Sequence, residues 1–235
     1  MATPNRPLLI GDPSGPSPPY PLLMSGRVIS GFGRGSKELG IPTANLPVDS
    51  GPQTSWLSSA VSGVYFGWAA LRLPENHPDL PSASSSSSAQ NGFTIYPMVM
   101  SIGYNPFYKN TVRSAEVHVL HKFSADFYGA EMRLLILGFV REEKDYSSLD
   151  ALVADILFDC DVAKRSLARK GWAPKGVAVS IVGFPPEDGP SVDKGKDWTG
   201  ETVVVQDGKL EAGWLWRPSE LSEEEEKKRD GEKQE

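Results

Sequence analysis

Gly31, Gly33 and Gly35 alternate with two larger residues near the start of the sequence. Because glycine has no Cβ, the backbone of such a run can adopt positive φ and approach a ligand closely. Successive exposed amides in a turn of this kind form a concave site for anions, and Lys37 adds a mobile positive charge. The run predicts a phosphate-binding loop, with a glycine-rich hairpin loop that binds nothing as the alternative.

The residues that follow the loop have the chemistry of a metal site. Pro42 fixes the chain as it enters an extended segment. Residues two apart in a strand project to the same face, so Thr43 and Asn45 point the same way. Hydroxyl and carboxamide oxygens suit a hard cation such as Mg²⁺. A phosphate loop followed by oxygen ligands predicts a nucleotide site.

Two widespread nucleotide motifs are absent from the sequence. A Walker loop requires G-x-x-x-x-G-K followed by Ser or Thr, which no window satisfies. A dinucleotide fingerprint requires G-x-G-x-x-G at the start of a helix, whereas the third glycine here comes one position early and Pro42 obstructs a helix. The predicted nucleotide site is therefore of another type.

Composition narrows the class of protein. With 235 residues, 39% of them hydrophobic and 23% charged, the chain suits one globular domain with irregular ends. The net charge of -6 argues against a nucleic-acid partner, and no apolar run approaches the length of a membrane span. A single cysteine, Cys160, excludes an internal disulfide and favours a reducing compartment. No targeting peptide is evident, so we expect a cytoplasmic monomer.

Segments of the chain differ in composition. Residues 1–19 are rich in Pro, Gly and Ser, and we expect them to be flexible. Residues 20–171 form the expected domain, interrupted by a serine-rich stretch at 74–92 that reads as a solvated hairpin insertion. Residues 172–218 form a C-terminal extension, and residues 219–235 form a charged tail.

Runs of β-branched and aromatic residues bounded by turn formers predict strands. The candidate strands are residues 26–30, 43–46, 63–73, 93–102, 114–123 and 132–140. Apolar residues at helical steps from Leu149 to Leu167 predict one amphipathic helix, with Ser147 and Asp150 as a capping pair and Gly171 as the stop. These elements predict a mainly β protein, a small antiparallel barrel with a helix packed against it. Cys160 lies on the apolar stripe of the helix, as a core residue would.

Five blocks in a fixed order resemble the riboflavin kinase family. They are GFGRGSKELGIPTANLP (31–47), GVYFGWA (63–69), MVMSIGYNPFYKNT (98–111), AEVHVLHKFSADFYG (115–129) and REEKDY (141–146). The resemblance covers roughly residues 20–170 and implies a six-stranded antiparallel Greek-key barrel. It implies that the chain transfers a phosphoryl group from MgATP to the ribityl 5′-hydroxyl of riboflavin, giving FMN and ADP. The divalent cation it implies is Mg²⁺, with Zn²⁺ or Mn²⁺ as alternatives.

The catalytic candidate lies in SAEVHVLHKF. In a strand, Ser114, Glu116 and His118 share one face. Phosphoryl transfer to an alcohol needs a group that orients the hydroxyl and takes its proton. A carboxylate at this position could equally be an ordinary surface residue. The resemblance assigns Glu116 the role of the base.

The resemblance, together with the glycine-rich loop, assigns the remaining site residues. The expected nucleotide contacts are Gly31, Gly33, Lys37, Thr43, Val119, His121 and Tyr128, and the expected metal ligands are Thr43 and Asn45. The expected riboflavin contacts are Arg141, Lys144 and Tyr146, in a loop that closes over the flavin. Ordinary sheet histidines at His118 and His121, and a solvated charged connection at 141–146, are the structural alternatives.

Two other classes of function remain open from the sequence. The chain could be a non-catalytic flavin or nucleotide carrier on the same barrel, although Glu116 and the two oxygen ligands argue against this. It could also be an interaction module that binds a protein through its tryptophan-rich C-terminal region. Residues 177–184 and 202–206 there are candidate extra strands that would cover the barrel and shelter the tryptophans.

Overall fold

The structure is a computed structural model that describes residues 6–30, 40–48, 52–80, 89–104, 113–185 and 201–217. Its elements are β1 (Leu22–Arg27), β2 (Ala44–Leu46), the 3₁₀ helix η1 (Pro52–Ser58), β3 (Gly63–Arg72), β4 (Ala89–Gln90), β5 (Phe93–Tyr104), β6 (Arg113–Val119), β7 (Glu131–Glu142), α1 (Leu149–Leu167), β8 (Val179–Phe184), β9 (Glu201–Val205) and the 3₁₀ helix η3 (Gly213–Trp216). Gly31, Gly33, Lys37 and the tail at 219–235 lie outside the described residues. Among the helices that are described, none is long and apolar enough to cross a membrane.

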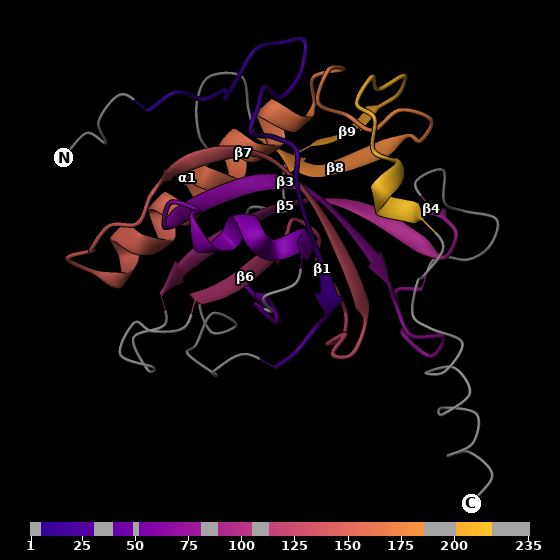
Figure 1. Cartoon of the computed structure of the whole chain (residues 1–235), viewed down its shortest axis with the longest axis horizontal. Coiled ribbons are helices and arrows are strands. Elements are labelled where there is room, and N and C mark those ends of the chain that lie inside the picture. Colours follow the sequence, from indigo (N-terminus) through magenta and orange to yellow (C-terminus); the bar gives the residue numbers. More distant parts are fainter. Residues whose placement is uncertain are drawn as a thin grey trace, which may run out of the picture.

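Six strands curl into an antiparallel barrel in the order β1-β7-β3-β5-β6-β2 (Figure 1). Strands β3, β5 and β6 are neighbours, and β7 returns beside β3, which is the Greek-key arrangement. The two edges meet where the backbone N–H of Ile29, just after β1, donates to the carbonyl of Asn45 at 2.9 Å. The six-stranded Greek-key barrel with one helix is therefore confirmed.

The curled sheet has a hydrophobic core on each side. Alternate residues of β6, namely Ala115, Val117 and Val119, are buried inside the barrel. On the outer side, Phe66 and Trp68 of β3 pack in a second core with α1, β8 and β9. Figure 1 shows α1 along the outside of the sheet, with β8 and β9 beside it. The helix and the C-terminal strands thus cover an apolar face that the barrel alone would expose.

The N-cap of helix α1 lies one residue later than predicted. The hydroxyl of Ser148, and not that of Ser147, accepts the N–H of Ala151 at 3.2 Å. The pairing predicted between Ser147 and Asp150 is wrong for this reason. Cys160 is 1% exposed, so its predicted place in the core is confirmed.

Residues 6–19 pack against α1 and the turn that follows it, which differs from the flexibility predicted for residues 1–19. The indole Nε1 of Trp172 donates to the carbonyl of Asp12 at 2.7 Å. Gly11 has a φ of +72°, and a Cβ there would lie 2.5 Å from a carbon of the Trp172 ring. Only glycine lets the backbone lie this close to the indole. Composition predicted flexibility because it does not reveal that these residues pack on Trp172, which is far away in the sequence.

The C-terminal extension forms the two strands predicted for it, β8 and β9, which pair antiparallel. Trp172 is buried, and Trp214 and Trp216 are half-buried against the outer core. Nε1 of Trp214 donates to the carbonyl of Leu134 in β7 at 3.2 Å. These three tryptophans cover the outer face of the barrel, as was predicted for the C-terminal extension.

Candidate functional site

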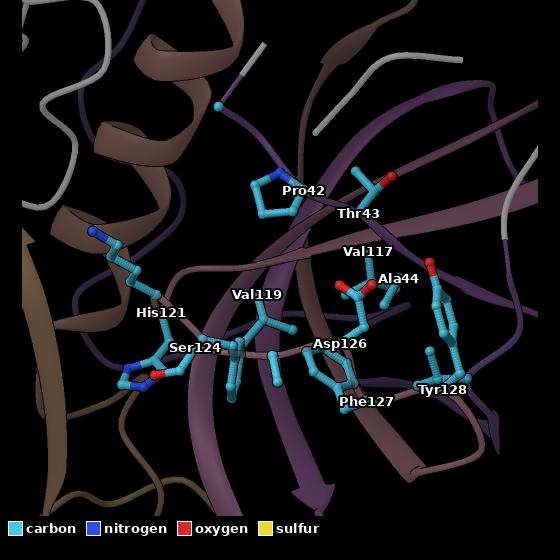
Figure 2. Close-up of a pocket in the computed structure, with 15 residues that line it drawn as sticks. Pro42, Thr43, Ala44, Val117, Val119, His121, Ser124, Asp126, Phe127 and Tyr128 are labelled. Carbon is cyan, nitrogen blue, oxygen red and sulfur yellow. The ribbon is translucent and has the colours of Figure 1, made fainter. Parts of the chain in front are cut away.

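A cavity of about 480 Å³ opens where β2 begins and β6 ends. Its volume lies in the range of small-molecule sites. Four residues predicted to contact nucleotide line it, namely Thr43, Val119, His121 and Tyr128 (Figure 2). Position 43 and positions 119–128, which are far apart in the sequence, therefore meet in one place. The predicted contacts Gly31, Gly33 and Lys37 precede this region but are not described.

The connection after β6 supplies one wall of the cavity. Phe123 and Phe127 meet edge to face with their ring centroids 4.7 Å apart, and Tyr128 is 56% exposed. Gly129 then turns the chain with a φ of +79°, and its N–H donates to the carbonyl of Val28 at 2.8 Å. The exposed ring of Tyr128 is available to a ligand.

The predicted base lies beside the predicted metal ligands. Asn45 and Glu116 are directly opposite each other in the antiparallel β2–β6 ladder. Opposed residues of such a ladder share a face, with Cβ atoms about 4.5–5.5 Å apart. Their neighbours Ala44 and Val117 point into the barrel, so Thr43, Asn45 and Glu116 belong to the other face. Of these three residues Thr43 lines the cavity, whereas Asn45 and Glu116 do not belong to its lining.

His118 is a structural residue of the sheet. Its side chain is 3% exposed overall, and Nδ1 lies 2.8 Å from the carbonyl oxygen of Pro42. A carbonyl oxygen can only accept, so the ring N–H donates. The bond ties β6 to the chain that enters β2. The structural alternative for this histidine is the one that the geometry supports.

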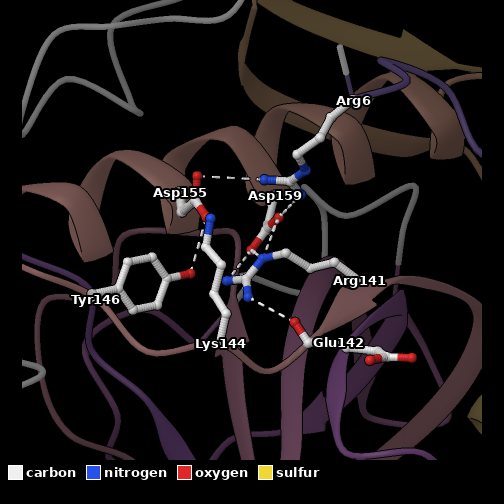
Figure 3. Close-up of polar contacts among 7 residues, drawn as sticks. All are labelled: Arg6, Arg141, Glu142, Lys144, Tyr146, Asp155 and Asp159. Atoms are coloured by element: carbon white, nitrogen blue, oxygen red, sulfur yellow. Dashed lines mark hydrogen bonds and ion pairs between the residues drawn. The ribbon is translucent and has the colours of Figure 1, made fainter. Parts of the chain in front are cut away.

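The three predicted riboflavin contacts bond to two aspartates of α1 (Figure 3). Nε and Nη2 of Arg141 lie 2.9 and 2.8 Å from Oδ2 of Asp159. The hydroxyl of Tyr146 donates to Asp155 at 3.0 Å, and the ammonium group of Lys144 contacts the same carboxylate. The segment after β7 is therefore fixed against the helix, outside the cavity. Arg141 and Tyr146 are half-buried, whereas residues 142–145 between them are exposed, as the alternative of a solvated connection predicts for them.

Arg6 of the N-terminal segment joins this cluster. Its guanidinium contacts Asp159, and its Nη1 lies 3.6 Å from Oδ1 of Asp155. Three cations, Arg6, Arg141 and Lys144, thus share two carboxylates, leaving one excess positive charge. Burial raises the pKa of Asp159, although both guanidinium groups favour its charged form.

Sequence reasoning missed Glu143 as an individual site residue. A Cβ on Gly103 would overlap the Glu143 carboxylate, so the absence of a side chain in β5 makes room for this acid. Burial raises the pKa of Glu143, and the nearby charge of Glu116 acts in the same direction. Lys122 and Asp126, which line the cavity, were missed as well. All three lie in blocks that resemble the family, but nothing in the blocks singles them out, because their surroundings depend on which strands are neighbours.

His121 lines the cavity and packs on the ring of Tyr96, with the centroids 4.7 Å apart. Burial lowers the pKa of His121 from its ordinary value of 6.5, although the charge of Asp79 opposes this shift. The unfolded chain therefore binds a proton more readily than the native protein does. Native stability is full above pH 6.5 and decreases as pH falls through that value toward the folded pKa.

We expect His121→Gln to reduce this dependence on pH. Urea unfolding at about pH 7.5 and about pH 5.5 measures the free energy of unfolding of each protein. The parent should lose more stability than the variant over this interval. Only the parent has the His121 imidazole, whose protonation is disfavoured by burial in the native state. Equal losses in the two proteins would contradict the expectation.

Comparisons with known proteins point to a single family. The family model "Flavokinase: Riboflavin kinase" matches residues 18–167. A riboflavin kinase of Chaetomium globosum is 63% identical over 243 residues, covering 94% of this chain and 97% of the relative. One from Pyricularia oryzae is 57% identical over 220 residues, covering 94% and 98%. A crystal structure of riboflavin kinase from Trypanosoma brucei is 28% identical with a TM-score of 0.49, covering 66% of this chain and 85% of that one.

The family model and the two fungal relatives define the class of protein as a small-molecule phosphotransferase, which here has a β-barrel fold. Within that class, the chain belongs to the riboflavin kinase family.

Proposed function

We infer that the chain phosphorylates riboflavin to FMN, with ATP as the phosphoryl donor and a divalent cation as cofactor. The family match and two relatives aligned over nearly their whole length support this activity. The structural observation that carries it is the opposition of Asn45 and Glu116 in the β2–β6 ladder, two residues along the chain from Thr43, which lines the cavity. Magnesium-dependent formation of FMN from riboflavin and ATP, followed by chromatography, tests it. A carrier protein would bind these ligands without making FMN.

The nucleotide occupies the 480 Å³ cavity in this proposal. Val119 and His121 contact the adenosine part, and the exposed ring of Tyr128 stacks against it. The β- and γ-phosphates extend along Thr43 toward Glu116, which lies on the same face of the sheet. The glycine-rich loop at Gly31–Gly35 cradles the phosphates from the other side.

Thr43 and Asn45 hold the divalent cation. Their oxygens suit Mg²⁺, which keeps several waters and is usually bound through few protein groups together with substrate phosphates. Among the residues that the structure describes, no group of three His, Cys, Asp or Glu could hold a metal ion. The cation neutralises charge on the phosphates when it is bound.

Glu116 accepts the proton of the ribityl 5′-hydroxyl as the oxygen attacks the γ-phosphorus of ATP in line. The bond from the γ-phosphorus to the bridging oxygen breaks, and ADP leaves. The flavin lies toward Arg141, Lys144 and Tyr146, where the excess positive charge of the α1 cluster favours the developing phosphate of FMN. Asp155 and Asp159 hold these side chains in place.

We expect Tyr128→Ala to raise KM for ATP about fivefold, since stacking of an aromatic ring on a base contributes about 1 kcal/mol. KM for riboflavin and kcat should stay close to the parent values. Tyr128→Phe keeps the ring and is the matched control, so its KM for ATP should be that of the parent. The measurement is initial rates of FMN formation. An unchanged KM for ATP in Tyr128→Ala would place the nucleotide outside this cavity.

A further inference from the structure

The first part of the serine-rich insertion packs behind the cavity wall. In the segment 74–80, His77 is only 8% exposed, whereas a solvated hairpin was predicted. The segment folds on itself, because the N–H of His77 donates to the carbonyl of Pro74 and the N–H of Leu80 to that of His77, both at 3.0 Å. It is a compact turn with its histidine directed inward.

This turn forms hydrogen bonds with two consecutive residues of the cavity wall, Ser124 and Ala125. The carboxylate of Asp79 accepts the N–H of Ser124 at 2.6 Å and its hydroxyl at 2.7 Å. Nε2 of His77 lies 3.2 Å from the carbonyl of Ala125, and its Nδ1 accepts the N–H of Asp79 at 3.2 Å. The imidazole therefore donates through Nε2 and accepts through Nδ1. Each wall residue is held by a separate side chain of the turn.

Aromatic packing adds to these bonds. The His77 ring meets Phe123 and Phe127 edge to face, with both centroid distances 6.4 Å. Both phenylalanines line the cavity, as do Ser124 and Ala125. The turn thus supports the wall at four neighbouring residues without lining the cavity itself.

The wall needs such support. Every residue from His121 to Tyr128 lines the cavity, and none of them belongs to a strand or helix. Without a ladder of backbone hydrogen bonds, such a segment is held by its tertiary contacts. A mobile wall would have to be ordered each time a ligand binds, and this ordering lowers affinity.

We propose that Asp79 and His77 are positioning residues for ATP, which hold the wall at 121–128 in the conformation that binds the nucleotide. The proposal rests on the inferred place of ATP in this cavity. Neither residue contacts the nucleotide. The bond from the Ser124 N–H lowers the pKa of Asp79, so the carboxylate is charged at neutral pH and accepts both bonds.

Asp79→Ala tests the proposal in the riboflavin phosphorylation assay. We expect KM for ATP to rise about tenfold, with kcat and KM for riboflavin within about twofold of the parent. Asp79→Asn should restore most of the affinity, because a carboxamide can accept the Ser124 N–H and donate to its hydroxyl. Glu211→Ala is the matched control: it removes an exposed carboxylate that bonds to Lys175 at 2.9 Å, far from the cavity in sequence.

The outcomes separate the possibilities. An unchanged KM for ATP in Asp79→Ala overturns the proposal. A parallel change in kcat and both KM values, with a lower unfolding midpoint, also overturns it, because the role would then be structural only. If Tyr128→Ala raises KM for ATP and Asp79→Ala does not, only the positioning role fails. If neither variant raises it, the cavity is not the nucleotide site, and the inferred location of ATP fails as well.

Discussion

Glu116→Gln is expected to lower kcat for riboflavin phosphorylation by about 10²–10⁴-fold, the usual contribution of a general base. Glutamine has the shape of glutamate but cannot take the proton of the attacking hydroxyl. Because Glu116 is only half-buried and its strand neighbours Ala115 and Val117 are untouched, the fold should be retained. Initial rates at saturating riboflavin and ATP measure the effect.

Glu142→Gln is the control for that experiment. Glu142 is an exposed carboxylate at the end of β7, and the contact it makes with Arg141 uses its backbone carbonyl. Its replacement should leave kcat unchanged. Binding of ATP to Glu116→Gln should match the parent, since the missing function is chemical. If the activity of Glu116→Gln stayed within about twofold of the parent, Glu116 would not be the base.

Asp159→Ala is expected to lower the free energy of unfolding by about 3–5 kcal/mol, the range found when one partner of a buried ion pair is removed. Asp159 is 1% exposed, and it contacts Arg141 and Arg6, each of which is only 14% exposed. Removal of the carboxylate leaves the guanidinium groups of Arg141 and Arg6 without the negative charge that Asp159 supplied. Denaturant unfolding with linear extrapolation measures the change.

Glu211→Ala again serves as the control. The pair formed by Lys175 and Glu211 is exposed on both sides, so its loss should not change stability measurably. A loss in Asp159→Ala no larger than that in Glu211→Ala would show that the buried cluster does not stabilise the fold. Such a result would also remove the argument that α1 holds the segment after β7 in place.

The strands were predictable wherever the sequence alternates or is rich in β-branched residues. The exceptions have physical causes. The first strand was predicted at 26–30 and lies at Leu22–Arg27, because the chain leaves β7 at this corner and Ile29 pairs with Asn45 instead. The strand predicted at 114–123 ends at Val119, where the chain turns into the cavity wall.

Tertiary contacts of irregular segments were not predictable. Pro, Gly and Ser at residues 1–19 and 74–92 suggested solvated chain, yet Asp12 accepts a bond from Trp172, and His77 is buried under the wall. Each contact joins positions far apart in the sequence, and neither partner has a local pattern that names the other. Among the described residues of these two segments, the regular structure is the two-residue strand β4, and the other contacts are made by irregular chain.

The sequence suggested a chemistry for the candidate site. The oxygen atoms of Thr43 and Asn45 indicated metal ligands, and the resemblance to the riboflavin kinase family assigned Glu116 the role of the base. Their proximity depends on the register of β2 against β6, which a single sequence does not reveal. The ion pair between Arg141 and Asp159 could not be predicted either, because a charged run is expected to be solvated when its partners are unknown.

Strand β2 is only three residues long, yet its alignment decides which side chains lie beside Glu116. A slip by one position would turn Asn45 into the apolar interior of the barrel and bring Ala44 beside the carboxylate of Glu116. Such a misaligned molecule would keep almost all of its circular dichroism and lose the proposed arrangement of metal ligands and base. The hydrogen bond between His118 and Pro42 and the β-bridge between Ile29 and Asn45 both oppose this register shift. For β2, the correct register therefore matters more than the stability of the strand.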